Sequence, residues 1–274
     1  MIKPTIECPC DRSLLERRFE YESPPAGETD FDLMDQDYQR AYDRCRACGH
    51  WFGSHHLDLG DLYGGNYVES TYGDRMAASF ERIISLPGSS SDNSGRRERL
   101  LMFAKEHLSS SPSPTLLDVG SGLGVFPYAM KAAGWVCTAL DPDPNACAHI
   151  AERVQIPTIN ADFLTVDTST LGTYDVITFN KVLEHVEDPC SMLRHVLIVT
   201  RAGGFVYLEV PDGDGAASLG QGREEFFVEH HHVFSTASLS AAVERSGLLV
   251  VRLDRIVEPS GKFTLVCFAI PQAD

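Results

Sequence analysis

The chain has 274 residues, with 23 lysines and arginines against 39 aspartates and glutamates, and its formal net charge is −16. A hydrophobic fraction of 43% is ordinary for a globular protein with a buried core, whereas the acidic balance disfavours nucleic acids and anionic membranes as partners. The sequence has no apolar run near the roughly 20 residues that span a bilayer, and its start lacks an apolar signal core. We therefore expect a cytoplasmic protein whose cysteines are reduced thiols.

The first 84 residues are expected to form an N-terminal module with its connector. They are poor in aliphatic residues, so a bound metal would supply stability that a small core cannot. The cysteines of this region are Cys8, Cys10, Cys45 and Cys48. The second pair has the spacing of zinc sites, and four thiolates suit tetrahedral zinc with no position open for chemistry. We therefore predict a structural zinc ion, with His50 as a substitute ligand and free thiols or a redox pair as alternatives.

Polar segments separate this region from the rest of the chain. The acidic segment 28–37 is expected to lie on the surface. Residues 85–95 are rich in serine and glycine and are expected to be a flexible linker. The segment 96–108 has helical spacing of apolar residues, and the charged run from Arg96 to Arg99 at its start is expected to face solvent.

From residue 115 onward, strand patterns alternate with helix patterns, so we assign 96–274 to one α/β domain. Strands are predicted at 115–119, 135–140, 156–159, 174–179, 205–210, 248–257 and 263–270, and helices at 122–133, 145–154, 190–200 and 238–246. Alternation of this kind predicts a mainly parallel sheet with helices on both faces. Only Pro259, Ser260 and Gly261 join the last two strands, which is too short for a parallel crossover and predicts an antiparallel hairpin.

A glycine-rich turn follows the first strand of this domain. Its residues run Asp118, Val119, Gly120, Ser121, Gly122, Leu123 and Gly124. Glycines let a ligand approach the backbone closely, and the start of the next helix presents free N–H groups. Nucleotide and adenosyl cofactors both use such turns. The dinucleotide fingerprint has its third glycine one residue later, where this chain has Val125, and this counts against a nicotinamide oxidoreductase.

Polar side chains follow the next strands at the same edge of the predicted sheet. Asp141 ends the second strand, where its carboxylate can accept hydrogen bonds from ribose hydroxyls. Asp162 follows the third strand and can hold an adenine amino group while Phe163 packs on the ring. Asn180 and Lys181 leave the fourth strand. A turn at Asp141 and a helix cap at Asp162 are the alternatives, but the whole series favours a single ligand crevice.

Together these segments resemble the class I S-adenosylmethionine-dependent methyltransferases. The glycine turn is similar to the first motif of that family, and residues 182–189 (VLEHVEDP) are similar to its signature after the fourth strand. The resemblance covers about 115–270 and implies a Rossmann-like, seven-stranded, mainly parallel sheet with an antiparallel last strand. It implies that S-adenosylmethionine contacts Tyr72, Asp118, Gly120, Ser121, Gly122, Gly124, Asp141, Pro142, Asp162, Phe163, Asn180, Lys181 and Val182. A packing role for Tyr72 stays equally open.

Three adjacent histidines follow the fifth strand. In an extended segment His230 and His232 share one face and His231 points to the other. Histidine is the natural general base near neutral pH. The segment is similar to the Glu-His-x-x-x-Phe-Ser/Thr stretch of small-molecule methyltransferases, which implies that His230, oriented by Glu229, takes the proton of the acceptor. Phe227 stands where sugar C-methyltransferases have a tyrosine, which counts against C-methylation. The structural alternative is that Glu229 and His230 only order the loop and cap the next helix.

We expect His185 and His231 to contact the acceptor. The pair Glu184 and His185 is similar to one in ubiquinone-type O-methyltransferases, for some of which a divalent ion is implied. A histidine that only packs and caps is the alternative for His185. The histidine run 230–232 is a second candidate metal site. The N-terminal region resembles the zinc-binding module that precedes methyltransferase domains in sugar-tailoring enzymes. This likeness rests on Tyr38, Tyr42, Cys45, Cys48, Gly49, His50 and Phe52.

The sequence therefore predicts a methyltransferase that acts on a small molecule, with a sugar or nucleotide-sugar hydroxyl as the expected acceptor in natural-product biosynthesis. C- or N-methylation is an alternative. A non-catalytic, cofactor-binding regulatory subunit is the alternative from another class of function. Whether the protein is a homodimer stays open.

Overall fold

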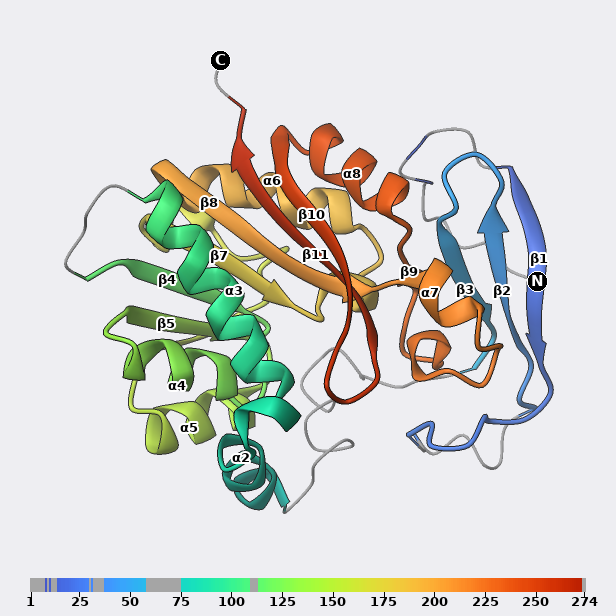
Figure 1. The fold of residues 1–274 in the computed structure, drawn as a ribbon, viewed down its shortest axis with the longest axis horizontal. Coiled ribbons are helices and arrows are strands. Elements are labelled where there is room, and N and C mark those ends of the chain that lie inside the picture. The colour runs from blue at the N-terminus through green and yellow to red at the C-terminus, as the bar shows by residue number, and fades with distance from the viewer. Residues whose placement is uncertain are drawn as a thin grey trace.

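The computed structural model describes residues 8, 10, 14–29, 31, 37–57, 75–108 and 113–272. Tyr72, one of the predicted cofactor contacts, lies outside these residues. Figure 1 shows a large sheet with helices around it and a small sheet of N-terminal strands at its side. Within the described part of the chain, no helix combines the length and the apolar character needed to cross a membrane.

The large sheet has seven strands in the order β10-β11-β8-β7-β4-β5-β6. They are β4 (Thr115–Val119), β5 (Val136–Asp141), β6 (Thr158–Asn160), β7 (Tyr174–Asn180), β8 (Thr200–Pro211), β10 (Leu248–Val257) and β11 (Phe263–Pro271). The strands from β4 to β8 pair in parallel, whereas β11 is antiparallel to both β8 and β10. The predicted Rossmann-like sheet and its terminal hairpin are confirmed.

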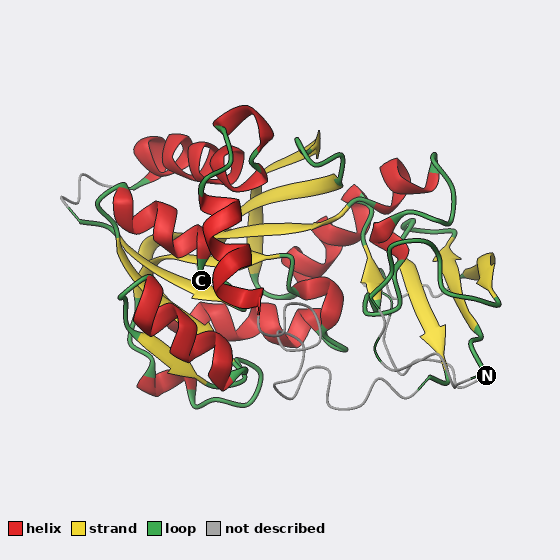
Figure 2. Cartoon of the chain, turned by 90° about the horizontal axis from the view of Figure 1, so that it is seen from below, coloured by secondary structure: helices red, strands yellow, loops and turns green. Residues whose placement is uncertain are grey.

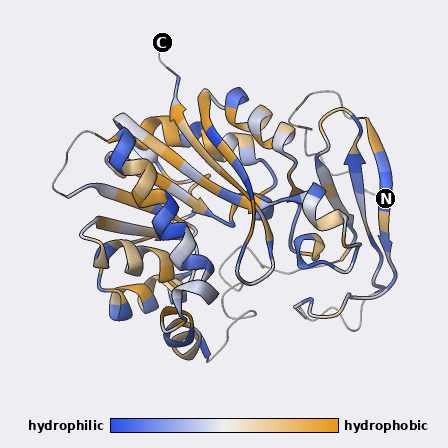
Figure 3. Cartoon of the chain, in the orientation of Figure 1, coloured by the Kyte–Doolittle hydropathy of each residue, from blue (hydrophilic) through white to orange (hydrophobic). Residues whose placement is uncertain are grey.

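Helices lie on both faces of this sheet, as Figure 2 shows, and an apolar layer packs on each face. The helices are α2 (Met76–Ile84), α3 (Asp92–His107), α4 (Val125–Ala132), α5 (Pro144–Arg153), α6 (Pro189–Val199) and α8 (Thr236–Arg245). Neighbouring strand residues alternate between the layers: Val176 packs with the helices α2 to α5, and Ile177 packs with α6 and α8. Because both faces are buried, the strands are apolar along most of their length, and Figure 3 shows hydrophobic residues concentrated here.

The predicted flexible linker at 85–95 is wrong. A 3₁₀ turn, η3 (Gly88–Ser90), leads into α3, which begins at Asp92 instead of residue 96. The reason is a helix cap, because the side chain of Ser91 accepts a hydrogen bond from the backbone N–H of Ser94. The start of α4 is also later than predicted, at Val125, since the glycines before it take positive φ angles.

The small sheet has the order β1-β2-β3-β9 and joins distant parts of the sequence. Its strands are β1 (Leu15–Tyr21), β2 (Arg40–Cys45), β3 (Trp51–His55) and β9 (His232–Val233), all antiparallel to their neighbours. An aromatic cluster with Tyr42, Trp51 and Phe226 joins these strands to a segment that holds α7 (Gly213–Ala217) and η6 (Glu224–Phe226). The division of the chain near residue 84 stays a prediction, while Phe80 of α2 packs in the core of the large sheet.

Three charged residues, Glu28, Arg96 and Arg99, are more buried or more paired than predicted. Glu28, expected on the surface, has a buried carboxylate that binds Nη2 of Arg40 at 2.7 Å. Arg96 and Arg99, expected to face solvent, bind the two carboxylate oxygens of the fully buried Glu209 at distances of 2.5 and 2.8 Å. A buried carboxylate needs such charged partners. For Glu209 both arginines lie more than a hundred positions away in the sequence.

Candidate active site

Two adjoining cavities lie at the carboxyl ends of β4, β5 and β7. The aspartate cavity, lined by Asp141 and Asp162 among others, has a volume of about 430 Å³. The histidine cavity, lined by Glu184 and His230 among others, has a volume of about 340 Å³. Gly120, Gly122, Lys181 and His185 line both cavities. A molecule bound in one cavity would therefore meet a molecule bound in the other at this shared wall.

The glycines of the turn after β4 have different surroundings. All three have positive φ angles, of +69° at Gly120, +50° at Gly122 and +70° at Gly124. A Cβ at Gly122 would meet nothing within 4 Å, because this residue faces the open space of the cavities. At Gly124 it would lie 2.7 Å from Cγ1 of Ile150 in α5, and this glycine lines neither cavity. Gly124 therefore serves helix packing, whereas Gly122 can admit a ligand.

The predicted carboxylates converge on the cavities. Asp141 accepts hydrogen bonds from the N–H groups of Gly122 at 2.8 Å and Asp143 at 2.9 Å, and burial raises the pKa of Asp141. Asp162 lines the same cavity and accepts from the N–H of Leu164 at 2.8 Å. Asp118 lines the histidine cavity, and burial raises its pKa to about 6. The geometry thus places the Asp141 carboxylate against the glycine turn, beside the aspartate cavity.

The other predicted cofactor contacts divide between the cavities. Pro142, Phe163 and Val182 line the aspartate cavity, and Ser121 and Asn180 line the histidine cavity. Phe163 is also part of the core, where its ring packs edge-on against Phe179 with centroids 5.7 Å apart. Asn180 donates to the carboxylate of Asp118 at 2.8 Å. Whether each residue contacts the cofactor stays a prediction.

Lys181 lies at the junction of the two cavities. Its φ of +62° is in the left-handed region, which is uncommon for a residue with a side chain. Its ammonium group donates to Oγ1 of Thr264 at 2.6 Å, and burial lowers the pKa of Lys181. Strained backbone of this kind is concentrated at functional sites. Lys181 is among the predicted cofactor contacts, whereas Arg96 and Lys262, which also line the histidine cavity, are not.

The three histidines do not alternate along an extended strand, so that prediction is wrong. The N–H of His230 donates to the carbonyl of Phe227 and closes a turn, and the strand β9 begins only at His232. As a result His230 lines the histidine cavity, His231 lines the aspartate cavity, and His232 is buried against His50. The capping alternative for Glu229 and His230 is also wrong, because the side chain of Ser235 caps α8.

Backbone carbonyls fix the tautomers of two histidines in the histidine cavity. Nδ1 of His230 lies 2.9 Å from the carbonyl of Glu225, and Nδ1 of His185 lies 3.1 Å from the carbonyl of Glu229. A carbonyl only accepts, so each neutral ring carries its hydrogen on Nδ1 and its lone pair on Nε2. Burial lowers the pKa of His185 to about 4 and that of His230 well below its usual value. Both rings are therefore neutral near pH 7.

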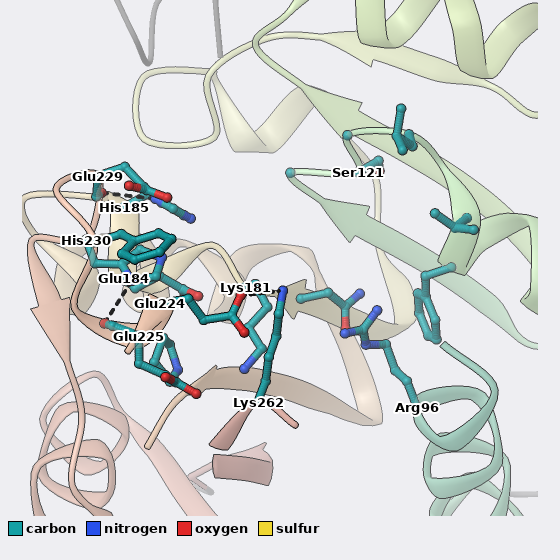
Figure 4. A pocket seen from close by; sticks show the side chains of 18 of the residues that line it. Arg96, Ser121, Lys181, Glu184, His185, Glu224, Glu225, Glu229, His230 and Lys262 are labelled. Atoms are coloured by element: carbon teal, nitrogen blue, oxygen red, sulfur yellow. Dashed lines mark hydrogen bonds and ion pairs between the residues drawn. The ribbon is translucent and has the colours of Figure 1, made fainter. Parts of the chain in front are cut away.

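Glu184 completes this group, as Figure 4 shows. One potential metal-ligand atom from each of Glu184, His185 and His230 lies within 4.8 Å of the other two. Burial raises the pKa of Glu184 to about 7, and its buried Oε2 has no hydrogen-bond partner in the described part of the chain. Such a group can share a proton, and it also matches the donor set of a divalent cation. The Nδ1–H of His230 is held by the Glu225 carbonyl. That Glu229 orients His230 stays a prediction.

The four predicted cysteines come together beside Phe52 of the small sheet. The Sγ atoms of Cys8 and Cys10 are 3.3 Å apart, those of Cys8 and Cys48 3.4 Å, and those of Cys10 and Cys45 3.7 Å. Tetrahedral zinc with bonds of about 2.3 Å places its sulfur ligands about 3.8 Å apart, so the donor set fits zinc. His50 is not a substitute ligand, because its ring nitrogens lie 3.0 Å from Oγ of Ser238 and 2.9 Å from Nδ1 of His232.

Comparison with known proteins agrees with this geometry. The ubiquinone biosynthesis O-methyltransferase of Aeromonas salmonicida is 29% identical over 149 residues, which are 49% of this chain and 63% of that protein. The protein of the same name from Vibrio parahaemolyticus is 34% identical over 97 residues, which are 34% of this chain and 41% of that protein. This chain thus spans less than two thirds of the length of either relative.

Solved structures show the same fold at low identity. The Burkholderia thailandensis 1,6-didemethyltoxoflavin-N1-methyltransferase with bound S-adenosylhomocysteine has a TM-score of 0.56 and 18% identity, over 87% of this chain and 98% of that one. Magnesium protoporphyrin IX methyltransferase from Synechocystis PCC 6803 has a TM-score of 0.54 and 15% identity, over 74% of this chain and 97% of that one. The family described as methyltransferase domain matches residues 93–253, more than half of the chain. The chain therefore belongs to the methyltransferase-domain family of S-adenosylmethionine-dependent enzymes.

Proposed function

We propose that this protein methylates a hydroxyl group of a small polar acceptor, a sugar or nucleotide-linked sugar, with His230 as the group that takes the proton. The observation that carries the proposal is the fixed tautomer of His230. Its Nδ1–H is held by the Glu225 carbonyl, so the lone pair of the neutral ring is on Nε2, and His230 lines the histidine cavity. The cavity adjoins the glycine turn, and the family to which the chain belongs supports a methyl donor bound beside this turn.

The aspartate cavity suits the adenosyl part of S-adenosylmethionine. Asp141 can accept from ribose hydroxyls while it holds the N–H of Gly122, and Asp162 can accept from the adenine amino group. Pro142 and Val182 supply apolar parts of the cavity wall. Bound S-adenosylmethionine supplies an electrophilic methyl group. What the chain must add is alignment of the acceptor oxygen and removal of its proton.

The histidine cavity suits a hydroxyl-rich acceptor. Glu224 and Lys262, which form an ion pair at 3.3 Å, line it together with Glu229 and can accept or donate hydrogen bonds. The carboxylate of Glu225, also in the lining, is held by Arg223 and by the N–H of Phe263. A proton taken by Nε2 of His230 would be stabilised by the Glu184 carboxylate, since an oxygen of Glu184 lies within 4.8 Å of one ring nitrogen of His230. The mixture of donors and acceptors supports a sugar over an apolar acceptor.

Structural zinc held by Cys8, Cys10, Cys45 and Cys48 is part of the proposal. Four thiolates leave no coordination position for substrate, so this ion would stabilise the small sheet and take no part in the chemistry. The fit of the sulfur distances to a tetrahedron supports it.

A divalent cation held by Glu184, His185 and His230 is the alternative way to remove the proton. The convergence of their donor atoms within 4.8 Å favours it, and a cation there would lower the pKa of a bound hydroxyl. The nearby ammonium group of Lys181 opposes it, because a second positive charge in a buried site is unfavourable. We therefore prefer His230 as a base.

The test compares His230→Ala with the wild-type enzyme. Turnover is measured with a panel of nucleotide-linked sugars, and affinity for S-adenosylhomocysteine is measured by calorimetry. We expect turnover to fall by about 10²–10⁴-fold, the usual contribution of a general base, with cofactor affinity unchanged. His107→Ala, at the far end of α3, is the control and should change neither value. Full turnover by His230→Ala would refute the proposed role.

A further inference from the structure

Residues of the small sheet and of the loop between β1 and β2 hold the segment that carries His230. Nη1 of Arg40 donates to the carbonyl of Phe226 at 2.7 Å, and the carboxylate of Glu28 accepts from the N–H of Val228 at 2.8 Å. The N–H of Gly53 donates to the carbonyl of His231 at 2.9 Å. The backbone on both sides of His230 is therefore fixed by residues from the first 57 positions of the chain.

Tyr42 makes the contact nearest to His230. Its hydroxyl lies 2.6 Å from the carbonyl of His230 and 3.0 Å from the carbonyl of Phe227, so its single proton is shared between two carbonyls of the same turn. The Phe227 carbonyl also accepts from the N–H of His230 at 3.1 Å. Tyr42 is 1% exposed and its ring is packed in the aromatic cluster, so the hydroxyl has little freedom to move. The turn is thus closed by one bond within itself and by Tyr42 from β2.

Gly53 shows independently how closely the small sheet fits against this turn. A Cβ at this position would lie only 2.7 Å from the carbonyl oxygen of His230, a distance that side chains do not tolerate. The φ angle of Gly53 is not in the left-handed region, so the backbone conformation alone does not require glycine. The close approach of the His230 carbonyl is what requires it.

From these contacts we propose that Tyr42 is a positioning residue for His230, and that the small sheet sets the rate of methyl transfer without contacting the cofactor. The proposal rests on the proposed function of His230. Neither Tyr42 nor Gly53 lines the two cavities. Displacement of the turn would move Nε2 relative to the acceptor oxygen, and a shift of about 1 Å can cost roughly a hundredfold in rate.

The experiment uses two tyrosines that make similar bonds from the same cluster. Tyr42→Phe removes the hydroxyl that binds the His230 turn, and Tyr21→Phe removes one that donates to the carbonyl of Gln221 at 2.8 Å. Each variant loses one hydroxyl proton donated to the backbone, which in Tyr42 lies between the carbonyls of Phe227 and His230, so we expect similar shifts in the urea midpoint. A purely structural role would therefore affect both variants alike.

We expect Tyr42→Phe to lower kcat by roughly ten- to a hundredfold while affinity for S-adenosylhomocysteine stays within about twofold, and Tyr21→Phe to retain kcat. The nucleotide-linked sugar with the highest turnover in the panel is the acceptor. Nitrogen NMR of labelled histidines gives a readout without any acceptor: the His230 signals should move in Tyr42→Phe and those of His107 should not.

Unchanged kcat and unchanged His230 signals in Tyr42→Phe would overturn the proposal, and so would equal losses of kcat in the two tyrosine variants. His230→Ala is measured beside them. Full turnover by His230→Ala means that the proposed function has failed. Inactive His230→Ala together with fully active Tyr42→Phe means that only the positioning role has failed.

Discussion

The glycine turn offers a prediction that separates folding from cofactor binding. Gly122 and Gly124 both have positive φ angles, but only Gly122 faces open space. An alanine in the left-handed region costs about 1–2 kcal/mol, so Gly122→Ala should lose stability of that order. At Gly124 the new methyl would lie 2.7 Å from Ile150 and 3.1 Å from Val154, both buried. Overpacking adds about 1–3 kcal/mol, which gives about 2–5 kcal/mol for Gly124→Ala.

Affinity for S-adenosylhomocysteine should instead be lower in Gly122→Ala than in Gly124→Ala. The methyl of Gly122→Ala enters the shared wall of the two cavities, and we expect at least about tenfold weaker binding of S-adenosylhomocysteine, since a methyl that blocks a bound ligand costs more than 1 kcal/mol. Gly124→Ala should bind nearly as tightly as wild type, because this glycine lines neither cavity.

Urea unfolding without ligand and calorimetric titration of the folded variants measure the two effects. If Gly122→Ala binds normally and Gly124→Ala does not, the assignment of the aspartate cavity to the cofactor is refuted.

Further predictions concern charge and metal. Arg96, acting against the opposing effect of burial, lowers the pKa of Glu209 from 4.5 to about 2, so this carboxylate should stabilise the fold above pH 4.5 by about 3 kcal/mol and lose that contribution as the pH falls toward 2. Urea unfolding against pH should therefore be flatter for Glu209→Gln, and an equal slope would contradict the assignment. Metal analysis should find about one zinc per chain and much less in Cys45→Ser, and a metal-free wild type would exclude zinc. Added Mg²⁺ should leave turnover unchanged if His230 is the base, whereas a strict requirement for Mg²⁺ would favour the cation held with Glu184.

The large sheet could be predicted because its signal is local. Apolar runs such as 115–119 and 174–179 alternate with helical patterns, and the short link at 259–261 forces a hairpin. The convergence of Asp118, Asp141 and Asp162 on adjoining cavities follows from the parallel topology, which brings the carboxyl ends of the strands to one edge.

The features that were missed depend on contacts between distant residues. Arg96 appeared as one more charge at a helix start, because nothing near it in sequence shows that Glu209 lies buried beside it. The histidine run has the local pattern of an extended strand, whereas the turn closed by His230 depends on Tyr42, which is 188 positions away. The tautomer of His230 is set by a backbone carbonyl, and a carbonyl has no side-chain signature in the sequence.

The position of β9 in the small sheet has a consequence for synthesis of the protein. β3 pairs with β2 on one side and with β9 on the other, so its second edge stays open until residues 232–233 have left the ribosome. An exposed strand edge invites pairing with other chains. The N-terminal part of the nascent protein must therefore wait for most of translation before its sheet is complete. Chains that stop before β9 should be prone to aggregate, and they should depend on chaperones more than the full-length protein does.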